Sequence, residues 1–244
     1  MRYFLEIAYH GAAYHGWQSQ LNVNTVQAEI NKALLTLLKT SIETIGCGRT
    51  DTGVHATQFY LHFDFIDTLP VDFIYRLNTI LPKDIAVFNL HIVHDDAHAR
   101  FDATYRSYIY YIHNHKHPFR NTISTYIPQH IINPVLLKAV ADCILLYNDF
   151  TSFTKTGGQA VSHNCTISQS HWVINEHILE YHITANRFLR GMVRRIVGAC
   201  IDVSKGKISL EEVQSALLHK KILPINTSMP PHGLFLTKVK YPYL

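Results

Sequence analysis

The sequence predicts an α+β fold of two halves, each with roughly one sheet and two packing helices. Strand-like segments predominate, and helical segments are interspersed among them. β-Hairpins occur beside longer crossovers, whereas strict alternation of strands and helices would indicate a doubly wound sheet. With 244 residues, the chain is long enough for two such halves, each with a buried core. We place the seam near residues 100–105 and expect halves 1–103 and 104–244.

The first half is expected to contain four strands and two helices. Residues 25–38 carry apolar side chains at helical spacing behind a polar cap at Asn24 or Thr25. Residues 55–65 alternate between apolar and polar side chains, which predicts a strand buried on one face. A short helical segment stops where Leu81 precedes Pro82. The expected strands are 3–8, 42–47, 55–65 and 85–94, and the expected helices are 25–38 and 72–80.

The second half is expected to begin with an aromatic strand and to end with another strand. A hairpin about Asn175 and Glu176 joins two alternating segments in its middle. Apolar side chains at helical spacing predict the helices on either side of that hairpin. The expected strands are 104–113, 168–174, 178–185 and 234–240, and the expected helices are 134–146, 187–203 and 210–219.

Bulk composition describes a folded, mildly basic protein. Hydrophobic residues make up 47% of the chain and charged residues 16%, which argues against disorder. The formal net charge is +4, and 17 histidines add positive charge as the pH falls. This balance favours a polyanionic partner without identifying one.

Cysteine spacing and hydropathy indicate an intracellular protein. The four cysteines are far apart and form no Cys-x-x-Cys pair, so we expect reduced thiols. No uninterrupted apolar run approaches the roughly 18 residues that span a membrane. The amino terminus also lacks a signal-peptide pattern. We therefore expect a cytoplasmic protein with no membrane segment.

The most informative stretch is Gly-Arg-Thr-Asp-Thr-Gly-Val-His-Ala at residues 48–56. It places Asp51 between glycines, in a segment too irregular for the middle of a helix or strand. Glycines let the backbone take positive φ and let a ligand approach closely. A carboxylate in this setting can be a nucleophile, a general base, a metal ligand or an ordinary turn residue. Arg49 lies close enough in sequence to balance its charge.

The aromatic strand at 104–113 is a second candidate for a site. Alternation puts Arg106 and Tyr108 on one face. A tyrosine ring there can stack on an unpaired base beside a phosphate-binding arginine. Packing in the core is the ordinary alternative for a tyrosine on a strand.

The expected helix at 187–203 has an unusual basic side. Arg187, Arg190 and Arg194 are spaced to share one helical face. Acidic partners one turn away are missing, so this face is suited to negative charge from elsewhere. Phosphates or a buried carboxylate would serve equally.

Two rival chemistries rest on single motifs. His94 with His98, and the histidines of 113–117, suggest a metal, but both groups lack the Cys or Glu companions of a zinc site. Residues 51–53 also match the Asp-Thr-Gly of aspartic proteases. Those enzymes need two facing carboxylates, and the sequence holds one copy of the tripeptide. We therefore expect neither a metal site nor a protease.

Seven stretches, taken in order, resemble the tRNA pseudouridine synthase A family across essentially the whole chain. The Arg-Thr-Asp-x-Gly-Val-His string is the most specific of them. Two positions depart from the family pattern: His10 stands where Asp is usual, and Arg190-Gly191 where relatives often carry bulkier side chains. The seven stretches are residues 9–20, 48–56, 81–85, 101–110, 150–153, 192–198 and 231–234.

The resemblance implies the pseudouridine synthase fold and a set of catalytic roles. That fold has two similar halves around a central mixed, mainly antiparallel sheet, with helices packed on it and a catalytic cleft between the halves. Asp51 would be the nucleophile, Tyr108 would pack on the target uracil and Arg194 would pair with Asp51. Arg49 would help to position the loop or the flipped nucleotide.

The resemblance also implies a substrate and partners. Family members act as homodimers on uridines 38, 39 and 40 of the tRNA anticodon stem-loop, with neither metal nor organic cofactor. Arg106, Arg187 and Arg190 would then bind the RNA backbone. The carboxylate can add to the base or assist at the sugar, and both routes stay open. A non-catalytic RNA-binding module on the same scaffold is the alternative function.

Overall fold

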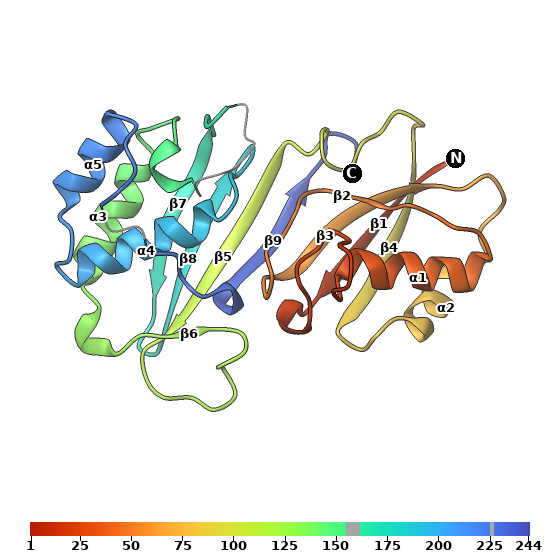
Figure 1. Cartoon of the computed structure of the whole chain (residues 1–244), viewed down its shortest axis with the longest axis horizontal. Coiled ribbons are helices and arrows are strands. Elements are labelled where there is room, and N and C mark those ends of the chain that lie inside the picture. The colour runs from red at the N-terminus through yellow and green to blue at the C-terminus, as the bar shows by residue number, and fades with distance from the viewer. Residues whose placement is uncertain (155–161, 225–226) are drawn as a thin grey trace. The chain divides into compact units, whose positions relative to one another are not determined.

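The computed structural model describes residues 1–154, 162–224 and 227–244. Figure 1 shows its helices and strands. The chain forms two compact units, one of residues 1–104 with 236–244 and the other of residues 105–235. Residues 236–244, expected in the second half, belong to the first unit. They group with the first unit because the Lys240 carbonyl accepts the Thr104 amide at 2.8 Å and the Tyr241 hydroxyl donates to the Ala99 carbonyl at 2.6 Å.

The first unit is built on a sheet with strand order β4-β1-β3-β9, and β2 pairs with β3. β1 runs antiparallel to both of its neighbours. Residues 236–240 are the part of β9 that belongs here. The elements are β1 (Arg2–Tyr9), α1 (Val26–Leu38), β2 (Ile45–Gly46), β3 (His55–Asp64), α2 (Phe73–Ile80), β4 (Ile85–Val93) and β9 (Leu234–Lys240).

Helix α1 follows from its cap and its apolar spacing, as expected. The Thr25 hydroxyl accepts the Ala28 amide, which satisfies one of the donors left unpaired at a helix start. Val26, Ile30 and Leu34 are fully buried along one side. The helix ends where Lys39 takes a left-handed conformation.

Strand β3 is buried on both faces over most of its length, so the prediction of a half-buried strand is wrong. Tyr60 and His62, on the face expected to meet water, are 7% and 3% exposed. The ring of Tyr241 meets Tyr60 edge-to-face at 5.3 Å, and Ala99 donates its amide to His62 Nδ1 at 3.1 Å. Tyr241 and the segment around Ala99 therefore cover the second face of β3, and alternation along β3 alone does not reveal this burial.

The second unit contains the sheet β5-β8-β7, with antiparallel pairs, and β6 runs parallel to the end of β5. Helix α3 packs on β7 and on α4, and α5 packs on α3. The elements are β5 (Tyr105–His113), β6 (Thr125–Tyr126), α3 (Pro134–Ile144), β7 (Ile167–Ile174), β8 (Ile178–Ala185), α4 (Met192–Ser204) and α5 (Leu210–Leu218).

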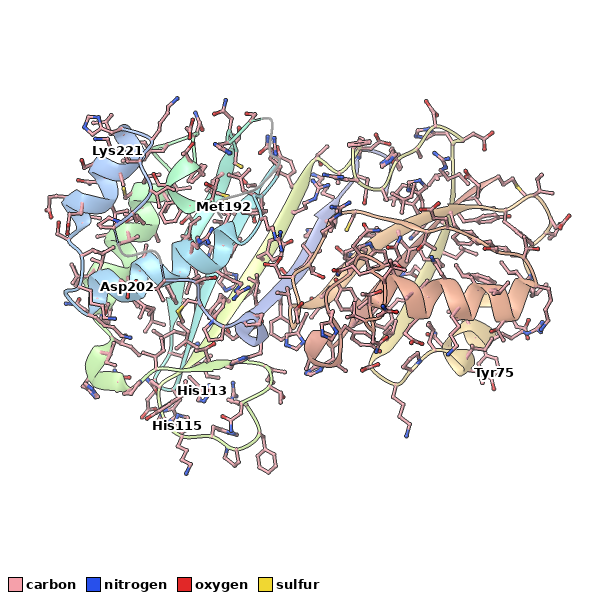
Figure 2. All side chains as sticks on the ribbon, in the orientation of Figure 1. Tyr75, His113, His115, Met192, Asp202 and Lys221 are labelled. Carbon is pink, nitrogen blue, oxygen red and sulfur yellow. The ribbon has the colours of Figure 1, made fainter. Side chains whose placement is uncertain are left out.

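Helix α4 begins later than the sequence predicts. It starts at Met192, and Figure 2 labels Met192 and Asp202 near its two ends. Gly191, just before it, has φ 69°, a left-handed conformation that interrupts a continuous helix. The expected start at residue 187 is therefore wrong by about one and a half turns. The short strand β6 was not expected, and β2 is shorter than the predicted strand 42–47.

The four cysteines are buried thiols, in agreement with the expectation from their spacing. Complete burial raises the pKa of Cys200 to about 12, and burial raises that of Cys165 to about 11. Within the described residues, no helix is long and apolar enough to cross a membrane. The same residues include no group of three or more His, Cys, Asp or Glu placed to hold a metal ion.

Candidate active site

The Asp51 loop connects β2 to β3 in a tight turn. Val54 donates its amide to the Asp51 carbonyl at 3.1 Å, and Gly53 donates its own to the Tyr14 carbonyl at 3.2 Å. Gly53 has φ 76°, so the turn needs the left-handed conformation that glycine adopts without strain. The Asp51 side chain is half-buried at the start of this turn.

Two glycines of the 9–20 stretch, Gly11 and Gly16, pack against this loop. A Cβ on Gly11 would lie 2.0 Å from the Val54 carbonyl oxygen, and one on Gly16 would lie 2.4 Å from that of Thr50. Gly16 also has φ 89°. Residues 9–17 therefore contact the backbone on both sides of Asp51. The stretches 9–20 and 48–56 thus lie side by side in the structure although they are far apart in sequence.

Hydrogen bonds fix the same contact. Trp17 donates its amide to the Thr50 carbonyl at 3.2 Å, and the Tyr9 and Thr50 hydroxyls lie 2.8 Å apart in a buried position. Gly11 donates its amide to His55 Nδ1 at 3.0 Å, which requires a lone pair on that nitrogen. The backbone before and after Asp51 is thus hydrogen-bonded to residues 9–17.

His10 lies beside His55, the histidine of the 48–56 stretch. Its ring centroid is 4.3 Å from that of His55. The His10 imidazole therefore fills space next to the Asp51 loop.

Arg49 lies on the rim of a pocket next to the Asp51 loop. Its Nε donates to Gln18 Oε1 at 3.2 Å, and the Gln18 amide donates to Gln27 Oε1 at 2.8 Å. The pocket has a volume of about 180 Å³, and Arg100 also lines it. Arg49 is exposed, so its charge is available to a polyanion.

Tyr108 and Arg106 project from β5 in the second unit. Tyr108 is half-buried, and the ring of Phe188 meets it edge-to-face with centroids 5.1 Å apart. Arg106 Nη1 donates to the Asn186 carbonyl at 3.0 Å. The connection between β8 and α4 therefore contacts both side chains, through the Asn186 carbonyl and the Phe188 ring.

Arg194 belongs to the first turn of α4. Its Nε donates to the Met229 carbonyl at 2.5 Å, and its own carbonyl accepts the Met229 amide at 3.1 Å. The side chain is half-buried. Of the predicted site residues, Arg106, Tyr108, Arg187, Arg190 and Arg194 occur in the second unit, and Arg49 and Asp51 occur in the first.

The expected basic helical face is not formed, because Arg187 and Arg190 precede the helix. Both are exposed in the connection that leads to Gly191. Arg187 donates its amide to Asn186 Oδ1 at 2.8 Å, in a turn that replaces the expected first helical turns. These two arginines therefore remain candidates for RNA contacts as loop residues and not as a helical stripe.

Sequence reasoning missed several residues that support the site. Phe188 supports Tyr108 through an edge-to-face ring contact. The roles of Gly11 and Gly16 were not foreseen, although glycines spaced five apart in a turn-rich segment are a signal of close backbone approach. The contact between Met229 and Arg194 has no sequence signal, because Met229 contributes only its backbone amide and carbonyl.

Known proteins resemble the chain over its whole length. A family model described as tRNA pseudouridine synthase matches residues 147–242. The tRNA pseudouridine synthase A of Azobacteroides pseudotrichonymphae genomovar. CFP2 is 42% identical, over 99% of this chain and 97% of the relative. That of Bacillus subtilis (strain 168) is 36% identical, over 99% of each chain. The chain belongs to the tRNA pseudouridine synthase A family.

Family membership agrees with the architecture described above. The mixed sheets and packed helices of the two units are the α+β structure expected of the pseudouridine synthase fold. The family is one of isomerases, so membership also excludes a protease reading of the Asp-Thr-Gly tripeptide. A relative from Parabacteroides distasonis, 39% identical over 99% of this chain, carries the same name.

Proposed function

We propose that the protein isomerises uridine to pseudouridine at positions 38, 39 and 40 of the tRNA anticodon stem-loop, with Asp51 as the nucleophile. The observation that carries this proposal is the Asp51 loop, which the 9–20 stretch holds in place through the close packing of Gly11 and Gly16. Relatives named tRNA pseudouridine synthase A, similar over 99% of the chain, support the reaction class. A fixed turn that presents one half-buried carboxylate suits attack on a single substrate atom.

Arg194 and Tyr108 complete the proposed site. Arg194 pairs with Asp51 and balances its charge, since an unpaired carboxylate in a site closed to water is costly. Tyr108 packs on the target uracil and replaces the stacking that the base loses when it leaves the RNA stack. The edge-to-face contact with Phe188 holds the Tyr108 ring in orientation.

The reaction rearranges one bond within a single nucleotide. The bond between N1 and the ribose C1′ breaks, the base turns, and C5 bonds to C1′ as the proton on C5 is lost and N1 gains one. The Asp51 carboxylate supports this by adding to the base or by bonding transiently at the sugar. Both routes require that the carboxylate be ionised at the start and be released at the end.

Four arginines bind the RNA backbone, and of these Arg106 is half-buried and the other three are exposed. Arg49 lies beside the Asp51 loop, and Arg106, Arg187 and Arg190 lie along β5 and the connection before α4. Lysine and arginine contacts to phosphate release counterions, so binding should weaken as salt rises. The protein acts in the cytoplasm, where its buried cysteines stay reduced, and works as a homodimer.

Mapping pseudouridine in tRNA transcripts tests this function. Unmodified transcripts are incubated with purified protein and no added metal, and pseudouridine is located at nucleotide resolution. We expect product at positions 38, 39 or 40 in substrates that carry uridine there. Binding of tRNA without product would favour the non-catalytic RNA-binding module, and product elsewhere in the tRNA would refute the assigned positions.

A further inference from the structure

We propose that residues 227–230 act as a strap that positions Arg194 and that Gly198 exists to let this strap approach. The proposal rests on the catalytic role given to Arg194 above. It assigns no contact with substrate to the strap, which is a positioning element and acts through the guanidinium.

The strap contacts Arg194 through the backbone amide and the backbone carbonyl of Met229. Met229 donates its amide to the Arg194 carbonyl at 3.1 Å, and its carbonyl accepts from Arg194 Nε at 2.5 Å. The first bond fixes the strap to the helix backbone, and the second fixes the plane of the guanidinium. A planar guanidinium held at Nε presents its remaining donors in one direction.

Gly198 makes this approach possible. It lies one turn beyond Arg194 in α4, where a Cβ would be 1.8 Å from the Thr227 carbonyl oxygen and 2.8 Å from its carbonyl carbon. Carbon and oxygen atoms that are not bonded stay more than about 3 Å apart, so any side chain here must separate helix and strap. Glycine in a helix interior lowers stability relative to alanine, and the close approach of Thr227 explains why glycine stands here.

The other end of the strap is tied to β5. The Tyr110 hydroxyl donates to the Pro230 carbonyl at 2.8 Å and lies 2.6 Å from the Thr125 hydroxyl. Tyr110 is fully buried and lies two residues from Tyr108, on the same strand. The strap therefore joins the helix that carries Arg194 to the strand that carries Tyr108, and a shift of the strap would disturb their mutual orientation.

Gly198→Ala tests the strap directly. We expect kcat for pseudouridine formation to fall at least about tenfold, because a displacement near 1 Å at a reacting group has effects of that size or larger. KM and the affinity for tRNA should stay within about twofold, since the strap makes no substrate contact. Gly206→Ala is the matched control, because it follows α4 and a Cβ there meets nothing within 4 Å. Gly206→Ala should lower the stability, because Gly206 has φ 66° and alanine is strained there, and it should leave kcat unchanged.

A double-mutant cycle separates positioning from general damage. If Gly198 acts through Arg194, then Gly198→Ala should lower kcat little further in an Arg194→Lys background. Effects that multiply would overturn the proposal. Should Arg194→Lys keep full turnover, the catalytic role of Arg194 fails, and the strap is then judged by the Arg194 Nε–H signal in nitrogen-15 NMR. Slow hydrogen exchange of that signal, accelerated by Gly198→Ala and not by Gly206→Ala, supports the strap, and equal exchange in all three proteins refutes it.

Discussion

Gly16 lies against Thr50 so closely that a Cβ on Gly16 would be 2.4 Å from the Thr50 carbonyl oxygen. The residue after Thr50 is Asp51, so this contact restricts the position of the backbone next to the proposed nucleophile. The loop is therefore positioned by backbone packing as well as by its own turn.

Gly16→Ala should damage both stability and activity. The new methyl group meets backbone, and Gly16 has φ 89°, so strain and clash together should cost about 2–4 kcal/mol. Chemical denaturation measures this loss, and pseudouridine formation should fall with it at temperatures where the variant is still folded. Gly48→Ala is the control for stability, because a Cβ on Gly48 meets nothing within 4 Å, and it should change the unfolding free energy by less than about 0.5 kcal/mol. Equal stability of the two variants would contradict the packing role of Gly16.

Tyr108→Phe should leave the fold intact and lower turnover. The ring and its contact with Phe188 remain, so thermal unfolding should match that of the unaltered protein. Turnover should fall about tenfold or more if the hydroxyl makes one hydrogen bond in the transition state. Single-turnover kinetics with a tRNA transcript measures this directly, and unchanged turnover would leave stacking as the whole role of the side chain.

Phe188→Leu should lower turnover without weakening tRNA binding. Leucine keeps apolar volume but loses the edge-to-face contact with Tyr108 at 5.1 Å, which is worth about 1 kcal/mol for such pairs. The Tyr108 ring would then sample more orientations, and we expect kcat to fall several-fold. A rise in the dissociation constant for tRNA with unchanged kcat would show that Phe188 contacts RNA and does not orient Tyr108.

Acidification should destabilise the first unit through His62. Burial, with Arg2 and His98 nearby, lowers the pKa of His62 to about 4, although Asp64 and Asp102 act in the opposite direction. The unfolded chain then binds a proton between pH 6.5 and 4 that the folded chain does not bind. Stability is present above pH 6.5 and falls as the pH drops, by about 2 kcal/mol between pH 7 and pH 5.

His62→Gln isolates this term. Glutamine can still accept the Ala99 amide, which His62 Nδ1 accepts at 3.1 Å. The free energy of unfolding should therefore depend less steeply on pH between 7 and 5 in the variant, measured by denaturant titration at each pH. An unchanged slope would show that His62 does not control acid stability.

Local patterns predicted most of the elements. Residues 25–38 and 210–219 have caps and apolar spacing that depend on near neighbours only, and the helices α1 and α5 form there. The Ser209 hydroxyl and the Glu212 carboxylate make a reciprocal capping box at the start of α5. Such elements are predictable because their signals lie within a few residues of each other.

Long-range contacts account for the errors. Both faces of β3 are buried because Tyr241 and the segment near Ala99 cover it, and these lie far from β3 in sequence. α4 starts late because Gly191 adopts a left-handed conformation, which apolar periodicity does not report. The identity of the proposed catalytic residues came from matching motifs, whereas their support by Gly16, Phe188 and Met229 comes from packing and backbone hydrogen bonds that spacing does not encode.

The most direct test of the central claim is pseudouridine formation by Asp51→Asn on a tRNA transcript, measured beside binding of the same RNA. The amide keeps the size of the side chain and removes its charge and nucleophilicity. We predict a dissociation constant for tRNA within about threefold of the unaltered protein and no detectable pseudouridine after prolonged incubation. Product formed at a rate close to that of the unaltered protein would contradict the assignment of Asp51 as the nucleophile.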